Sequence, residues 1–125
     1  MVGIVVVSHS QKLAEGVVEL AGMMASEVPV AAAGGLDDGG LGTSFEKISN
    51  AVNRVYSDDG VALIMDMGSA VMTAEMVMES MEDRKIKMID CPIVEGTVIA
   101  ALEVLSGTSL EQLQEKVASA GEKKF

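Results

Sequence analysis

The stretch Val2-Gly3-Ile4-Val5-Val6-Val7, followed directly by Ser8-His9-Ser10, decides the fold. A continuous apolar run rich in β-branched residues is typical of a parallel strand that is covered on both faces. A helical pattern over Lys12–Ala25 follows it, with apolar residues at Leu13, Val17, Leu20, Ala21 and Met24. The chain therefore begins with a buried strand that leads into a helix.

The rest of the chain repeats this alternation. Three further strands are predicted, at Pro29–Ala33, Val61–Met65 and Ile86–Ile89. The helices between and after them are predicted from Ser44 to about Tyr56 (inward face Phe45, Ile48, Val52 and Val55), from Gly68 to about Met81, at Val94–Leu105 and at Ser109–Ala120. The prediction is an α/β fold of one domain over residues 1–125, with an open, doubly wound, four-stranded parallel sheet and helices on both faces.

The amino-acid composition limits the classes of partner and of site that the protein can have. A hydrophobic fraction of 49% with only 2% aromatic residues predicts an aliphatic core. The formal net charge of −10 argues against nucleic acid and anionic membranes as partners, and it favours a basic protein surface. Cys91 is the one cysteine, so neither an intrachain disulfide nor a multi-cysteine metal site is expected. No apolar run approaches the roughly 20 residues that span a bilayer, and no signal sequence is recognised, which indicates a cytoplasmic location.

Polar residues gather directly after the strands, where parallel sheets place their ligands. His9, the only histidine, follows the first strand, and Asp66 follows the third. A neutral imidazole can accept a phosphoryl group, and a carboxylate on its other nitrogen fixes the tautomer. Ser10, Gly68 and Ser69 start helices and are candidate phosphate ligands. Two plainer interpretations stay open: His9 is structural, and Asp66 is a helix cap.

Other motifs exclude alternatives. The loop Gly34–Gly42 lacks the Gly-Lys-Ser/Thr ending of a nucleotide P-loop, so the chain is not expected to bind ATP, and Asp37 and Asp38 are interpreted as turn residues. One histidine is a poor zinc site, so neither a metal nor a cofactor is predicted. The methionines Met67, Met72 and Met76 are either core filling or an adaptable rim for partner proteins.

Four segments in this order resemble the dihydroxyacetone kinase phosphotransferase subunits (DhaM) of the mannose-type IIA group in the bacterial phosphoenolpyruvate-dependent phosphotransferase system. They are Val5–Ser10, Gly34–Ser44, Met65–Ala70 and Pro92–Gly96. The resemblance implies a phosphohistidine at His9, oriented by Asp66, with Gly68 and Ser69 at the phosphate-side turn.

The resemblance also implies the partners. The phosphocarrier HPr would be the donor, and ADP held on the DhaL subunit would be the acceptor, for phosphorylation of dihydroxyacetone on DhaK. It implies a homodimer too, although Ala118–Phe125 is too polar for the exchanged edge strand of mannose-type relatives. The alternatives are a IIA component of a sugar-transporting phosphotransferase system and a non-catalytic regulatory or dimerisation module.

Overall fold

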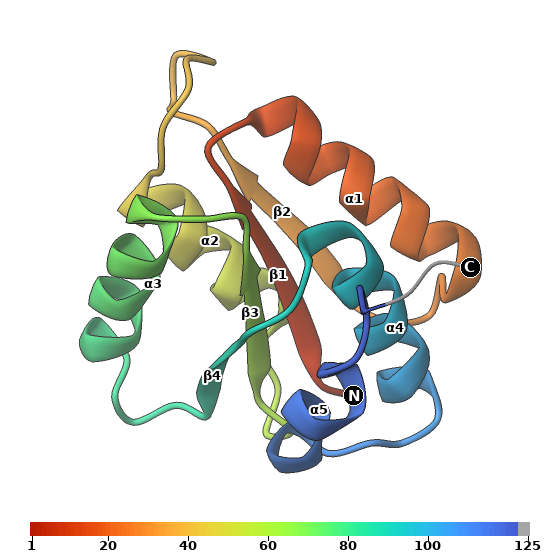
Figure 1. The fold of residues 1–125 in the computed structure, drawn as a ribbon. Coiled ribbons are helices and arrows are strands. Elements are labelled where there is room, and N and C mark those ends of the chain that lie inside the picture. Colours follow the sequence, from red (N-terminus) through yellow and green to blue (C-terminus); the bar gives the residue numbers. More distant parts are fainter. Residues whose placement is uncertain (123–125) are drawn as a thin grey trace.

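The computed structural model describes residues 1–122, which form one four-stranded sheet with helices on both sides (Figure 1). The strands are β1 (Gly3–Ser8), β2 (Val30–Gly34), β3 (Val61–Met65) and β4 (Ile86–Ile89). All neighbouring pairs are parallel, and the strand order is β2-β1-β3-β4. The predicted doubly wound architecture is confirmed, and β3 and β4 have the predicted bounds.

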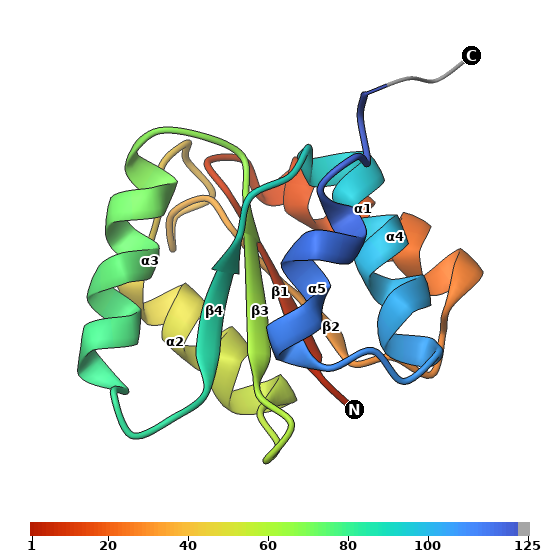
Figure 2. The same cartoon turned by 60° about the horizontal axis from the view of Figure 1, so that its bottom comes forward.

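The helices divide between the two faces of the sheet (Figure 2). One face is covered by α1 (Gln11–Met24), α4 (Ile93–Leu105) and α5 (Leu110–Val117), and the other by α2 (Phe45–Val55) and α3 (Ser69–Ser80). Side chains alternate along each strand, so β1 supplies Ile4 and Val6 to the first core and Val5 and Val7 to the second. Because both faces are buried, this strand reads as an unbroken apolar run.

Two helices bury only some of the apolar residues in their patterns. The buried residues of α1 are Ala14, Val17 and Ala21, whereas Leu13, Leu20 and Met24 are exposed. Phe45 at the start of α2 is also exposed, at 40%. The tight approach of α1 to the sheet favours small side chains, which displaces the larger ones to its flanks. Phe45 occupies the first helical position, where the chain has just left the loop.

The described C-terminal residues contact the chain just beyond β4 and form no strand. The side-chain amide of Gln114 in α5 accepts from the Asp90 amide (2.7 Å) and donates to the Asp90 carbonyl (2.9 Å), as a neighbouring strand would. Helix α5 ends at Val117, three residues earlier than predicted, and residues 118–122 form turns. The rest of the segment Ala118–Phe125 lies outside the described residues. Within residues 1–122, no helix has both the length and the apolar character to cross a bilayer.

Candidate functional site

The site lies where the direction of sheet growth reverses. β1 is followed along the chain by β2 on one side, whereas β3 pairs with β1 on its other side, with Val7 opposite Met65. The Asp66 amide donates to the Val7 carbonyl (3.1 Å), which continues this pairing beyond the strand ends. His9 and Asp66 therefore emerge side by side at such a switch point, the place where open parallel sheets bind ligands.

The imidazole of His9 is held at both nitrogens. Its Nδ1 lies 3.0 Å from Asp66 Oδ1, and its Nε2 lies 2.7 Å from the Ser69 hydroxyl oxygen. An ionised carboxylate can only accept, so Nδ1 carries the proton and Nε2 of the neutral ring keeps its lone pair. The Ser69 hydroxyl then donates to Nε2. The His9 side chain is 26% exposed and that of Asp66 is 12% exposed, so the reactive nitrogen lies near the surface above a shielded carboxylate.

Asp66 accepts more than this one hydrogen bond. The Ser8 hydroxyl (2.9 Å) and the His9 amide (3.0 Å) donate to Oδ2, and the Met67 amide (2.7 Å) donates to Oδ1. Burial by itself raises the pKa of Asp66, but the hydrogen bonds from the His9 amide, the Ser8 hydroxyl, the His9 ring and the Met67 amide lower it below its ordinary value of 3.8. The carboxylate is therefore ionised at neutral pH.

A turn at Gly68 positions Ser69 beside His9. Gly68 has φ 51° and ψ −117°, a conformation that L side chains rarely adopt, and the Ala70 amide closes the turn on the Met67 carbonyl (3.1 Å). No side chain caps the N-terminus of α3. The first amides of a helix lack partners within it and favour an anion. The turn thus brings a hydroxyl and a helix N-terminus to the free nitrogen of His9.

Ser10, the remaining predicted phosphate ligand, caps a helix and is not positioned like Ser69. Its hydroxyl accepts the Leu13 amide (3.1 Å) and so caps α1, and its own amide donates to the Ser8 hydroxyl (3.0 Å). The described contacts of Ser10 are with α1 and Ser8, and none is with the imidazole. The glycine loop approaches more closely, because the Gly42 amide donates to the His9 carbonyl (2.9 Å).

Ser8 is the residue that sequence reasoning missed. It is fully buried, and its hydroxyl links Asp66 to the Ser10 amide. It therefore supports the carboxylate at Oδ2, the oxygen that the His9 ring does not contact. The available signal was its place at the end of a buried strand, where a hydroxyl needs a partner.

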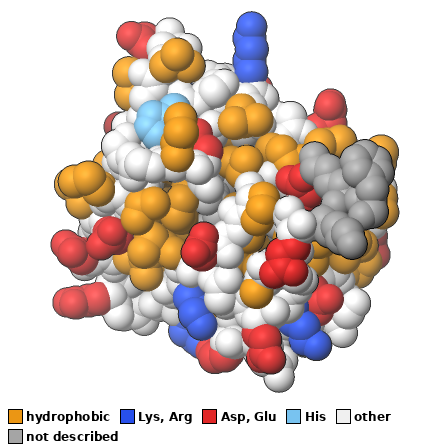
Figure 3. Space-filling model, in the orientation of Figure 1, with side chains coloured by type: hydrophobic (Ala, Val, Ile, Leu, Met, Phe, Trp, Pro, Cys, Tyr) orange, Lys and Arg blue, Asp and Glu red, His pale blue; other side chains and the backbone are white. Residues whose placement is uncertain are grey.

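Three exposed methionines lie on the turn into α3 and on that helix, whose N-terminus reaches His9. Met67, Met72 and Met76, here called the methionine rim, are exposed by 66%, 68% and 57%. Figure 3 shows hydrophobic side chains close to the histidine. A depression of about 520 Å³ adjoins Asp66 on the β4 side and includes Met65, Met88 and Cys91 in its lining. Burial, assisted by the charge of Asp90, raises the pKa of the Cys91 thiol to about 11, so the thiol stays protonated.

Comparison with known proteins identifies the family of the chain. The family model EIIA-man, described as the PTS system fructose IIA component, matches residues 3–118. The chain belongs to the EIIA-man family. Within that family it belongs with the DhaM subunits: the phosphotransferase subunit DhaM of a PTS-dependent dihydroxyacetone kinase from Lactococcus lactis subsp. lactis (strain IL1403) is 34% identical, over 92% of each chain.

Other EIIA-man relatives extend the comparison. The phosphoryl donor subunit DhaM of a PEP-dependent dihydroxyacetone kinase from Escherichia coli (strain K12) is 38% identical over 120 residues. The match covers 90% of this chain and 25% of that protein, so the chain spans about a quarter of the E. coli relative.

Solved structures share the fold. A crystal structure of a protein of unknown function has a TM-score of 0.86 at 29% identity, covering 99% of this chain and 98% of the other. A phosphotransferase system component EIIA from Streptococcus agalactiae has a TM-score of 0.73 at 17% identity, covering 98% and 93%. The fold is thus that of a IIA protein of the phosphotransferase system.

Proposed function

We propose that this protein is the DhaM-type phosphoryl donor subunit of a dihydroxyacetone kinase and that it carries the phosphoryl group on Nε2 of His9. The donor is phospho-HPr. The acceptor is ADP bound to the DhaL subunit. DhaL then passes the phosphoryl group to dihydroxyacetone on the DhaK subunit. In this proposal residues 1–125 act as one domain, as a homodimer, in the cytoplasm, and with no metal or cofactor of their own.

The transfer is a displacement at phosphorus. The lone pair of Nε2 forms the new phosphorus–nitrogen bond while the bond from phosphorus to the donor's histidine nitrogen breaks, and that nitrogen takes the electron pair. The proton on Nδ1 stays in its hydrogen bond to Asp66, whose negative charge stabilises the imidazolium-like product. The reverse displacement, with an oxygen of ADP as nucleophile, returns the ring to its starting state.

One observation carries the proposal: Asp66 holds Nδ1 at 3.0 Å, which leaves Nε2 as the ring nitrogen with the lone pair, beside the Ser69 hydroxyl. The Ser69 hydroxyl and the uncapped N-terminus of α3 provide donors for the incoming phosphoryl oxygens. Ser10, which caps α1 directly after His9, is a further candidate phosphate ligand in this proposal. The methionine rim suits successive docking of two partners on one site.

The first test is phosphoryl acceptance from phosphoenolpyruvate through enzyme I and HPr, followed by intact-mass analysis. The wild type should gain one acid-labile phosphoryl group, and His9→Ala should gain none while keeping its circular dichroism spectrum. Selective NMR of the imidazole nitrogens should place the phosphorus on Nε2. A phosphoryl group on His9→Ala would refute the proposed site, and a structural role for His9 would leave the wild type unmodified.

The second test identifies the acceptor. Phosphorylated protein is mixed either with DhaL–ADP or with the membrane permease of a mannose-type sugar system. Rapid loss of phosphate to DhaL–ADP supports the DhaM assignment. Transfer to the permease alone would instead make the chain a sugar-transporting IIA component.

A further inference from the structure

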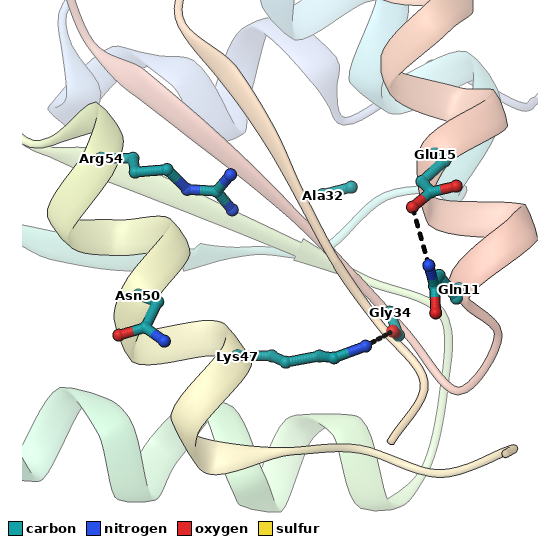
Figure 4. Close-up of a pocket in the computed structure, with 7 residues that line it drawn as sticks. All are labelled: Gln11, Glu15, Ala32, Gly34, Lys47, Asn50 and Arg54. Carbon is teal, nitrogen blue, oxygen red and sulfur yellow. Dashed lines mark hydrogen bonds between the residues drawn. The ribbon is translucent and has the colours of Figure 1, made fainter. Parts of the chain in front are cut away.

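A groove runs along the free edge of β2, separate from the His9 pair. Its floor contains Ala32 and Gly34 of β2, one wall carries Gln11 and Glu15 from α1, and the other carries Lys47 and Arg54 from α2 (Figure 4). Its volume is about 390 Å³. An edge strand flanked by two helix walls is a shape that accepts an extended peptide.

The backbone of β2 has hydrogen-bonding groups left for such a peptide. The Ile4 amide donates to the Pro29 carbonyl, and the Gly35 amide donates to the Ser8 carbonyl. Alternate residues of β2 therefore pair with β1, and the residues between them, Ala32 and Gly34 among them, direct their backbone groups away from the sheet. The Gly34 carbonyl accepts from Lys47 Nζ (3.0 Å), which leaves the Ala32 amide and carbonyl as the central open pair.

The groove carries basic side chains, although the whole protein is acidic. The chain has a net charge of −10, yet Lys47 and Arg54 both extend from α2 toward the β2 edge (Figure 4). Lys47 donates a hydrogen bond to the Gly34 carbonyl. The exposed Arg54, in contrast, has no hydrogen-bond or ion-pair partner among residues 1–122. An unpaired guanidinium beside open backbone groups fits a carboxylate.

We propose that this groove binds an extended segment of a partner protein that adds to β2 as a further strand and places an acidic side chain on Arg54. The backbone of Ala32 supplies the strand hydrogen bonds, and Arg54 supplies the selectivity. The site lies on the β2 side of His9, whereas the methionine rim lies on the α3 side. Binding there requires no phosphoryl group and is independent of the function proposed for His9.

The test uses NMR of the full isotope-labelled chain with two capped peptides, one of alternating glutamate and valine and one of alternating lysine and valine. The net charge of the protein attracts the lysine peptide, so a preference for the glutamate peptide can arise only from a local site. The expected result is that the glutamate peptide shifts the amide signals of Ala32 and Gly34 and that the lysine peptide does not.

Three variants sharpen this test. Arg54→Glu should weaken binding of the glutamate peptide by about tenfold or more, because attraction becomes repulsion. Lys116→Glu makes the same change of charge in the last turn of α5 and should leave binding unchanged. Ala32→Pro removes one outward amide without breaking a bond to β1, and it should abolish binding while the remaining NMR spectrum shows a folded protein.

The proposal is wrong if neither peptide binds, if the lysine peptide binds as well as the glutamate peptide, or if the shifts fall outside the groove. It is also wrong if Ala32→Pro converts a dimer of this chain into monomers, because a second copy would then occupy the groove.

Discussion

Asp66 accepts four hydrogen bonds, from the Ser8 hydroxyl, the His9 amide, the His9 ring and the Met67 amide. Asp66→Asn replaces one acceptor oxygen by a donor in the midst of these donors. Phosphoryl acceptance should fall by up to about 10⁴-fold, as when the orienting aspartate of a serine protease is replaced by asparagine. Unfolding should also become easier by about 2 kcal/mol at neutral pH. Rapid-quench kinetics and denaturant titration measure the two effects.

The stability effect of Asp66 has a defined pH dependence. Since its folded-state pKa lies below 3.8, the stability it contributes is present above that pH and is lost as the pH falls through the folded-state pKa. The difference between wild type and Asp66→Asn should therefore shrink in acid. The exposed Asp37→Asn is the control for the loss of one charge. A difference that stayed constant down to acidic pH would show that Asp66 makes no such contribution.

Ser69 contacts Nε2, the nitrogen proposed to react, at 2.7 Å. Ser69→Ala removes the hydroxyl that donates a hydrogen bond to Nε2 and, in the proposed transfer, to the phosphoryl oxygens. The transfer rate should fall about tenfold, which corresponds to the loss of one ordinary hydrogen bond. Ser80→Ala, at the other end of α3, is the matched control, because the one described hydrogen bond of its hydroxyl, within residues 1–122, is to the Val77 carbonyl. Equal rates for the two variants would remove Ser69 from the site.

Among the elements, the turn into α3 offers the clearest test. An added Cβ at Gly68 would meet no atom within 4 Å, so Gly68→Ala acts only through the backbone angle φ of 51°. The strain should cost about 1–2 kcal/mol of stability and should displace Ser69 from His9. Gly107 also has a positive φ and open space around it, but it follows α4, on the side of the sheet opposite α3. Gly107→Ala should therefore cost similar stability in thermal unfolding with no loss of transfer, whereas Gly68→Ala should lose both.

At the scale of the whole molecule, two forces compete for partner recognition: the net charge of −10 and the methionine rim. A carrier must release each partner, so a small interface of under about 1,200 Å² is expected. Met72→Asp should weaken docking of both HPr and DhaL and leave His9 reactive toward a small phosphoryl donor. Met23→Asp, an equally exposed methionine near the end of α1, should have no effect. Transfer kinetics over a salt series would identify charge as the dominant force if rates collapse with salt and Met72→Asp behaves like wild type.

The sequence predicted what depends on local pattern. Unbroken apolar runs located the strands, and the rule that chemistry sits at strand ends brought His9 and Asp66 together before their distance was known. Phe45 was placed inside wrongly, and Leu13 of the apolar pattern is exposed, because periodicity gives the face of a helix but not how closely that helix approaches the sheet. The groove beside Ala32 could not be predicted, because it depends on β2 being an edge strand. The pattern of apolar residues locates the strands but does not give their order in the sheet.

The separation of His9 from Asp66 has a further consequence. They are 57 residues apart in the chain and meet because β3, which follows β2 and α2 in the sequence, pairs beside β1. A ribosome releases the histidine long before its aspartate, so nascent or misassembled chains expose an imidazole without a fixed tautomer and without the α3 turn. If the proposed function holds, such chains should accept phosphoryl groups poorly, so that acceptance would require completed folding.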